Sequence, residues 1–143
     1  MVVADTSFLF SLFGADTHTG AAKNWATEAK RPIIVTALNR YEFGNAIRFA
    51  VFRKVILRAD ALISLTAFET DLEKGNLQLV PCDLVTVVAE AARISELHTL
   101  NGGHRSFDIL HVATASVLKA ATFLTFDTNQ RRLATTLRLA VGP

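Results

Sequence analysis

Two aspartates that each follow an apolar, strand-like run are the residues of this chain best placed to do chemistry. Asp5 follows the run Val2–Ala4, and Asp127 ends the run that begins at Thr122. In a parallel α/β sheet, ligands and reactive groups gather beyond the carboxyl ends of the strands, so two such carboxylates can meet at one edge. Like charges brought together repel each other unless a cation lies between them. The two acids therefore predict a metal-dependent acidic site.

Two further acids lie near the starts of predicted helices: Glu42 one turn into its helix and Asp108 in the first turn of another. The helix that begins near Asp108 carries no other charge until Lys119, so it belongs in the centre of the fold and its N-terminus opens onto the middle of the sheet. Each acid also has a purely structural interpretation. Asp5 and Asp127 could be N-caps, Asp108 a partner of the helix dipole, and Glu42 an ordinary surface residue.

Short apolar runs that alternate with helical periodicity predict alternating strands and helices. The expected strands are Val2–Ala4, Ile33–Thr36, Asn76–Val80, Thr122–Phe126 and a marginal Leu139–Val141. The expected helices are Phe8–Phe13, Thr19–Lys30, Leu38–Lys54, Arg58–Lys74, Thr86–Leu100, Ser106–Lys119 and Thr128–Leu137. Strands separated by helices imply a central parallel sheet of four to five strands with helices on both faces. We therefore expect one α/β domain over residues 1–143.

Polar residues near the acids carry more local signals. Thr6 or Ser7 is expected to cap the first helix. Gln130, three residues after Asp127, completes the pattern of a capping box. His111, one turn into the apolar helix, is predicted to be a packed core histidine rather than a proton donor.

Composition sets limits on partners. Half of the 143 residues are hydrophobic, which is enough for a substantial core, and 15 Lys and Arg against 13 Asp and Glu give a net charge of +2. If four acids bind a metal ion, the remaining surface is basic and suits a polyanionic substrate, although a weakly basic surface with no partner explains the composition equally well. No apolar run approaches the length that spans a bilayer, so a soluble, cytoplasmic protein without a membrane partner is expected.

Other acidic α/β sites are disfavoured by missing motifs. An aspartyl-phosphate phosphatase of the haloacid dehalogenase type needs a second aspartate two residues after the first, where this chain has Ser7. There is no glycine-rich phosphate loop and no Gly-x-Gly-x-x-Gly, which counts against a nucleotide cofactor. The four histidines lack a His-Glu-x-x-His spacing, which counts against a zinc hydrolase.

The chain resembles PIN-domain nucleases, and within that family it is similar to the VapC toxins of prokaryotic toxin–antitoxin pairs. The resemblance runs along all 143 residues and is carried by Val3–Ser7, Glu42, Arg105–Ala115 and Leu124–Asp127. It implies that the catalytic and metal-binding residues are Asp5, Glu42, Asp108 and Asp127. It also implies that hydroxyls beside them come from Thr6, Ser7 and Thr125. Mg²⁺ or Mn²⁺ would be the cofactor, and RNA the substrate.

Partner surfaces are expected from the same resemblance and from the side chains themselves. The resemblance implies a homodimer and a cognate antitoxin protein. We expect RNA phosphates to be bound by Arg105, Arg48 and Arg53. For Arg48 and Arg53, the alternative is that they belong to a solvated helix face. The aromatic-rich helix Tyr41–Phe52, with Leu62–Phe68, is expected to leave an apolar groove into which an amphipathic antitoxin helix docks.

Two other functions stay open at this point. One is a non-catalytic PIN-like module that binds RNA or protein, and the other is a magnesium-dependent phosphatase of small molecules. The presence of all four acids disfavours the first, and the absent nucleophile motif and the basic balance disfavour the second.

Overall fold

The structure, a computed structural model, describes all residues from 1 to 143 as alternating strands and helices. The strands are β1 (Val2–Ala4), β2 (Ile33–Val35), β3 (Leu77–Leu79), β4 (Thr122–Leu124) and β5 (Val141–Gly142). The helices are α1 (Thr6–Phe13), α2 (Thr19–Ala29), α3 (Ala37–Phe52), α4 (Arg58–Glu73), α5 (Leu84–Gly102), α6 (Ser106–Val117) and α7 (Thr128–Thr136). Every expected element is present, and no boundary moves by more than two residues.

All five strands are parallel, in the order β3-β2-β1-β4-β5. The apolar run at the start of the sequence, β1, therefore occupies the centre of the sheet. Its Val3 lies between Ile34 of β2 and Phe123 of β4. The backbone N–H of Asp5 donates to Leu124 O at 2.9 Å, so β1 and β4 end side by side. The predicted parallel α/β architecture is confirmed, and its carboxyl edge brings Asp5 close to the residues after β4.

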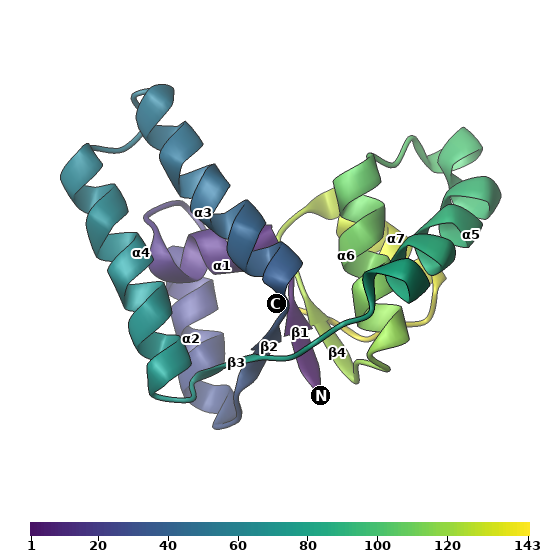
Figure 1. Ribbon diagram of the computed structural model, residues 1–143, viewed down its shortest axis with the longest axis horizontal. Helices are drawn as coiled ribbons and strands as arrows, with labels where there is room; N and C mark the ends of the chain where they lie inside the picture. Colours follow the sequence, from purple (N-terminus) through teal and green to yellow (C-terminus); the bar gives the residue numbers. More distant parts are fainter.

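Helices cover both faces of the sheet, as predicted. Because successive side chains of a strand point to opposite faces, Val2 and Ala4 join a core with α1 to α4, while Val3 joins a second core with α5 to α7. Figure 1 shows these two helical layers on either side of the strands, with α3 and α4 projecting as a long hairpin. No helix combines the length and the apolar character needed to cross a membrane.

Candidate acidic site at the carboxyl edge of the sheet

Asp5 is completely buried at the junction of β1 and α1. Its Oδ1 accepts the Phe8 N–H at 2.8 Å, which makes Asp5 the N-cap of α1. The expectation that Thr6 or Ser7 caps this helix is wrong, because the aspartate one residue earlier takes that position. The Ser7 hydroxyl donates to Asp5 at 2.8 Å, and the Thr125 hydroxyl donates to Oδ2 at 2.8 Å. Burial raises the pKa of Asp5, and these hydrogen bonds offset only part of that rise.

Asp127 caps α7 and shares two hydroxyls with Asp5. Its Oδ1 accepts the backbone N–H groups of the second and third helical residues, both at 2.9 Å. Its own N–H donates to Thr125 Oγ1 at 3.0 Å and to Ser7 Oγ at 3.2 Å. Two hydroxyls therefore tie together two acids that are far apart in the sequence. Both acids are N-caps, and they also lie side by side at one edge of the sheet.

Asp108 lies in the first turn of α6 with only 6% of its surface exposed. Arg105 donates through Nε to Asp108 Oδ2 at 2.8 Å, and its Nη2 lies 3.5 Å from Asp127 Oδ2. The Gln130 side chain donates to Asp108 Oδ1 at 3.2 Å. The predicted capping box at α7 is thus wrong in its second half, because Gln130 reaches across to α6 instead of back to the N–H of Asp127. Asp5, Asp127 and Asp108 form one connected network.

Glu42, in the second turn of α3, lies near this network but has its own hydrogen-bond partners. Its Oε2 accepts hydrogen bonds from Thr6 Oγ1 and from Nε2 of His111, which stands one turn after Asp108 on α6. Burial acts to raise the pKa of Glu42, but the hydrogen bonds from His111 and Thr6, together with nearby positive charge, outweigh it and hold the pKa below its usual value. We call Asp5, Glu42, Asp108 and Asp127 the acid cluster.

Of the three arginines expected to bind RNA, only Arg105 lies at the acid cluster. Arg48 lines a cavity of about 390 Å³ between α3 and α4. Arg53 is the C-cap of α3. At 1.5 Å per residue, it lies about 16 Å further along the helix than Glu42. A substrate that contacts all three must therefore extend along the α3 side of the molecule.

Sequence reasoning missed the contacts that two buried amides make beside the cluster. Gln130 is 5% exposed, and Asn39, in the first turn of α3, is 1% exposed. Asn39 Oδ1 accepts the N–H of Thr36 at 2.9 Å and its hydroxyl at 2.8 Å. The Thr36-x-x-Asn39 spacing was the only sequence signal for Asn39. Nothing in the pattern indicated that Gln130 contacts Asp108.

The donor atoms of the cluster fit a hard divalent cation in chemistry. All are carboxylate oxygens, the ligands that Mg²⁺ and Mn²⁺ prefer. Burial of Asp5 and Asp108 leaves their negative charge poorly solvated, and the raised pKa of Asp5 has that cause. No three His, Cys, Asp or Glu side chains are arranged to hold a single ion between them, however. The positive charge of the Arg105 side chain is instead shared by Asp108 and Asp127.

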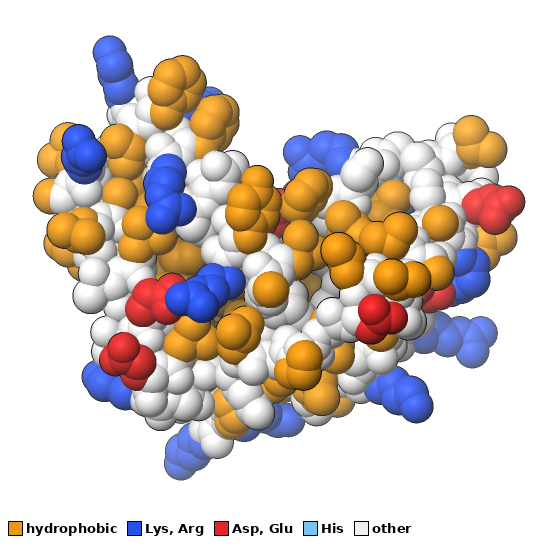
Figure 2. Space-filling model, in the orientation of Figure 1, with side chains coloured by type: hydrophobic (Ala, Val, Ile, Leu, Met, Phe, Trp, Pro, Cys, Tyr) orange, Lys and Arg blue, Asp and Glu red, His pale blue; other side chains and the backbone are white.

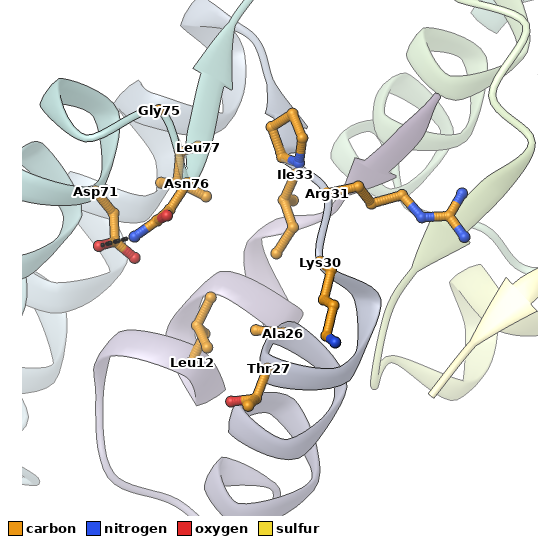
Figure 3. Close-up of a pocket in the computed structure, with 11 residues that line it drawn as sticks. Leu12, Ala26, Thr27, Lys30, Arg31, Ile33, Asp71, Gly75, Asn76 and Leu77 are labelled. Atoms are coloured by element: carbon orange, nitrogen blue, oxygen red, sulfur yellow. Dashed lines mark hydrogen bonds between the residues drawn. The ribbon is translucent and has the colours of Figure 1, made fainter.

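Two hollows differ in their relation to these acids. A cavity of about 400 Å³ is bounded by Thr6, Ser7 and Asp127, and beside them the His18 ring stacks on Phe126 with centroids 4.4 Å apart. A second cavity, of about 480 Å³, lies at the opposite edge, where β2 and β3 begin. Figure 3 shows its polar side chains, with Asp71 bonded to Asn76. Of these two hollows, only the first is lined by an acid of the cluster, Asp127.

Comparison with solved structures finds the same fold in a toxin and in two further structures. VapC20 of Mycobacterium tuberculosis, described as a sarcin–ricin loop cleaving toxin, superposes with a TM-score of 0.71 at 14% identity over 92% of this chain and 94% of its own. VapBC2 of Rickettsia felis, solved with a promoter DNA fragment, gives a TM-score of 0.65 at 14% identity over 99% of this chain and 98% of its own. FitAcB of Neisseria gonorrhoeae gives a TM-score of 0.62 at 17% identity over 100% of this chain and 97% of its own.

At these identities the likeness establishes the fold, and a comparison with curated protein sequences finds no significant match. A family model matches the sequence directly. The PIN domain model covers residues 2–135, a span that includes all four acids and both helical layers. The chain therefore belongs to the PIN domain family, as the motifs around its acids predict.

Proposed function

We propose that this protein is an Mg²⁺- or Mn²⁺-dependent endoribonuclease and the toxin of a VapBC-type toxin–antitoxin pair. The observation that supports the proposal is the acid cluster: Asp5, Asp108 and Asp127 are linked through hydrogen-bonding side chains at the carboxyl edge of one parallel sheet, and Glu42 lies beside them. Membership of the PIN domain family and a fold shared with a sarcin–ricin loop cleaving toxin support the same reaction.

In the proposed reaction, Asp5 and Asp108 would hold the metal ion directly, and Glu42 and Asp127 would complete the site. A hard divalent ion supplies an acidified water and neutralises charge on the phosphodiester. The chain itself fixes the carboxylates in place. Ser7 and Thr125 hold Asp5, while Thr6 holds Glu42. These hydroxyls remove rotational freedom before the substrate arrives, which is the preorganisation that electrostatic catalysis requires.

RNA would reach the acids through the hollow beside Thr6 and Asp127. Arg105 is the basic residue best placed to contact a phosphate there, because 72% of its side chain is exposed although it bonds two acids. Arg48 and Arg53 would contact phosphates further along the strand. A net charge of +2 that includes the buried acids leaves a more basic outer surface, which favours a polyanion.

A partner protein would dock on the hairpin of α3 and α4. Phe49, Phe52, Leu57, Leu62 and Ile63 are each more than half exposed there. Figure 2 shows orange side chains gathered over this hairpin, with basic side chains among them. Exposed apolar surface of this kind marks protein-binding sites. An amphipathic helix of a cognate antitoxin is the proposed occupant, in line with the antitoxin complexes among the structures of the same fold.

Two further parts of the proposal concern assembly and location. We propose a homodimer formed through the start of α5, where Leu84 and Val85 are 61% and 78% exposed beside an apolar cavity of about 570 Å³. We propose that the protein acts in the cytoplasm, where its RNA substrate is. Light scattering of the purified protein measures the first, and fractionation of the source cells the second.

A second candidate function is a non-catalytic PIN module that binds RNA. The observation in its favour is that no three acidic or histidine side chains converge on one point. In that case Arg105 would permanently neutralise Asp108 and Asp127, and RNA would bind without being cleaved.

The test is cleavage of a structured RNA with 5 mM MnCl₂, compared with hydrolysis of p-nitrophenyl phosphate. The proposal expects the protein to cleave RNA and EDTA to abolish this cleavage. Asp108→Asn should lower the cleavage rate about 100-fold or more. Hydrolysis of the small ester should be much slower than cleavage of RNA. Asp71→Asn is the matched control, because Asp71 lies in the cavity at the far edge of the sheet. RNA binding without cleavage would establish the second candidate, and ester hydrolysis alone would indicate a phosphatase.

A further inference from the structure

His111 contacts the acid cluster although it belongs to the core. The side chain is 2% exposed, and its Nε2 is hydrogen-bonded to Glu42 Oε2. Thr6 Oγ1 donates to the same carboxylate oxygen. Glu42 has no other side-chain or backbone partner, and 27% of its side chain is exposed. Without these two donors, a glutamate with three rotatable bonds on a helix surface would be free to turn towards solvent.

Asn39 determines which imidazole nitrogen faces Glu42 as a donor. The Asn39 Oδ1 accepts the backbone N–H of Thr36, which can only donate, so the orientation of the amide is fixed. The amide nitrogen then donates to Ala4 O at 3.0 Å and lies 3.3 Å from His111 Nδ1. Nδ1 must therefore accept, and the ring hydrogen is on Nε2, directed at Glu42. Both ring nitrogens are bonded to protein groups, which leaves neither free to contact a substrate.

We propose that His111, held in this tautomer by Asn39, is the positioning residue for Glu42. The inference rests on the proposed metal-dependent function and identifies what fixes one of its four carboxylates. Asn39 also bonds the carbonyl of Ala4, the residue before Asp5, so a single buried amide couples the end of β1 to α3 and α6. Removing a partner that orients a metal-binding side chain in this way lowers metal affinity or activity about 10- to 100-fold.

Two substitutions separate positioning from packing. In His111→Gln, the amide nitrogen takes the place of Nε2 and can still donate to Glu42. In His111→Leu, the volume is similar but no donor remains. The primary measurement is the Kd for Mn²⁺ alone, by titration calorimetry without RNA, and thermal unfolding of each variant reports on packing. If His111→Leu does not fold, His111→Asn gives the same comparison, because its shorter amide reaches only the position of Nδ1.

His111→Leu, which loses the donor, is expected to bind Mn²⁺ about 10-fold or more weakly than the parent protein. The Kd of His111→Gln for Mn²⁺ should stay within about 3-fold of the parent value. RNA cleavage should follow, with kcat lowered and KM unchanged. In a Glu42→Gln background, His111→Leu should cost no further Mn²⁺ affinity. Unchanged Mn²⁺ affinity in a folded His111→Leu variant overturns the proposal, and so does an equal loss in the Gln and Leu variants. A parent protein that binds no Mn²⁺ would instead refute the proposed function itself.

Discussion

The Nε of Arg105 lies 2.8 Å from Oδ2 of Asp108, and the same guanidinium reaches Asp127 at 3.5 Å. One exposed side chain thus neutralises part of the negative charge of two acids, one in α6 and one after the end of β4. Because the aliphatic part of Arg105 is not packed in the core, this contact can open without disturbing the fold. In the proposed function, the guanidinium and a divalent cation would therefore compete for the same two carboxylates.

Arg105→Gln is expected to bind Mn²⁺ more tightly than the parent protein. Replacing the guanidinium removes a positive charge a few Å from the ion, which is worth about ten-fold in affinity in a partly solvated site. Binding to a non-cleavable RNA should weaken in the same variant if Arg105 contacts phosphate. Titration calorimetry with each ligand measures the two effects. Arg93→Gln, which breaks an ion pair with Glu90 on α5, is the control and should change neither.

Asp5→Asn is expected to stabilise the metal-free protein while abolishing activity. Asn is as good an N-cap as Asp, so α1 keeps its cap. Burial raises the pKa of Asp5 in the folded state, so the parent protein loses stability as the pH rises from the unfolded pKa of about 3.9 through the folded value. The advantage of the Asn variant should therefore be smallest near pH 4 and grow with pH.

Urea unfolding in EDTA between pH 4 and pH 9 measures this difference. The other titrating groups are common to both proteins, so their contributions largely cancel. A difference that stays constant with pH, or that shrinks as the pH rises, would contradict the role of burial at Asp5.

The fold was predictable because its signals are local. Val2–Ala4 and Thr122–Phe126 are apolar runs that end in an acid, and a parallel sheet brings such ends together whatever lies between them. The meeting of Asp5 and Asp127 follows from that topology. The partners of each acid did not follow, because they depend on side-chain direction. Gln130 stands where a capping box would use it, yet the nearby carboxylate of Asp108 takes its amide.

Thr125→Val is expected to lower the free energy of unfolding by about 1–3 kcal/mol. The Thr125 hydroxyl is fully buried, donates to Asp5 Oδ2 at 2.8 Å and accepts the Asp127 N–H at 3.0 Å. The substitution keeps the side-chain volume, so the loss reports on the hydrogen bonds. Thr125→Ser keeps the hydroxyl and should retain most of the activity, whereas the Val variant should lose activity. Chemical denaturation and RNA cleavage of both variants measure this, and equal effects of Ser and Val would show that the methyl group matters instead.

Phe52→Glu is expected to abolish antitoxin binding without affecting folding or cleavage. The Phe52 side chain lies near the end of α3, is 77% exposed and stacks on Phe49 with centroids 5.8 Å apart, so a charge there meets solvent in the free protein and an apolar surface in the complex. An unpaired charge at the centre of an apolar interface costs several kcal/mol, enough for about a 100-fold loss of affinity or more. Leu100→Glu on α5, where the leucine is 94% exposed, is the matched control. Binding is measured with the protein encoded beside this one, and tight binding to Phe52→Glu would place the antitoxin on another face.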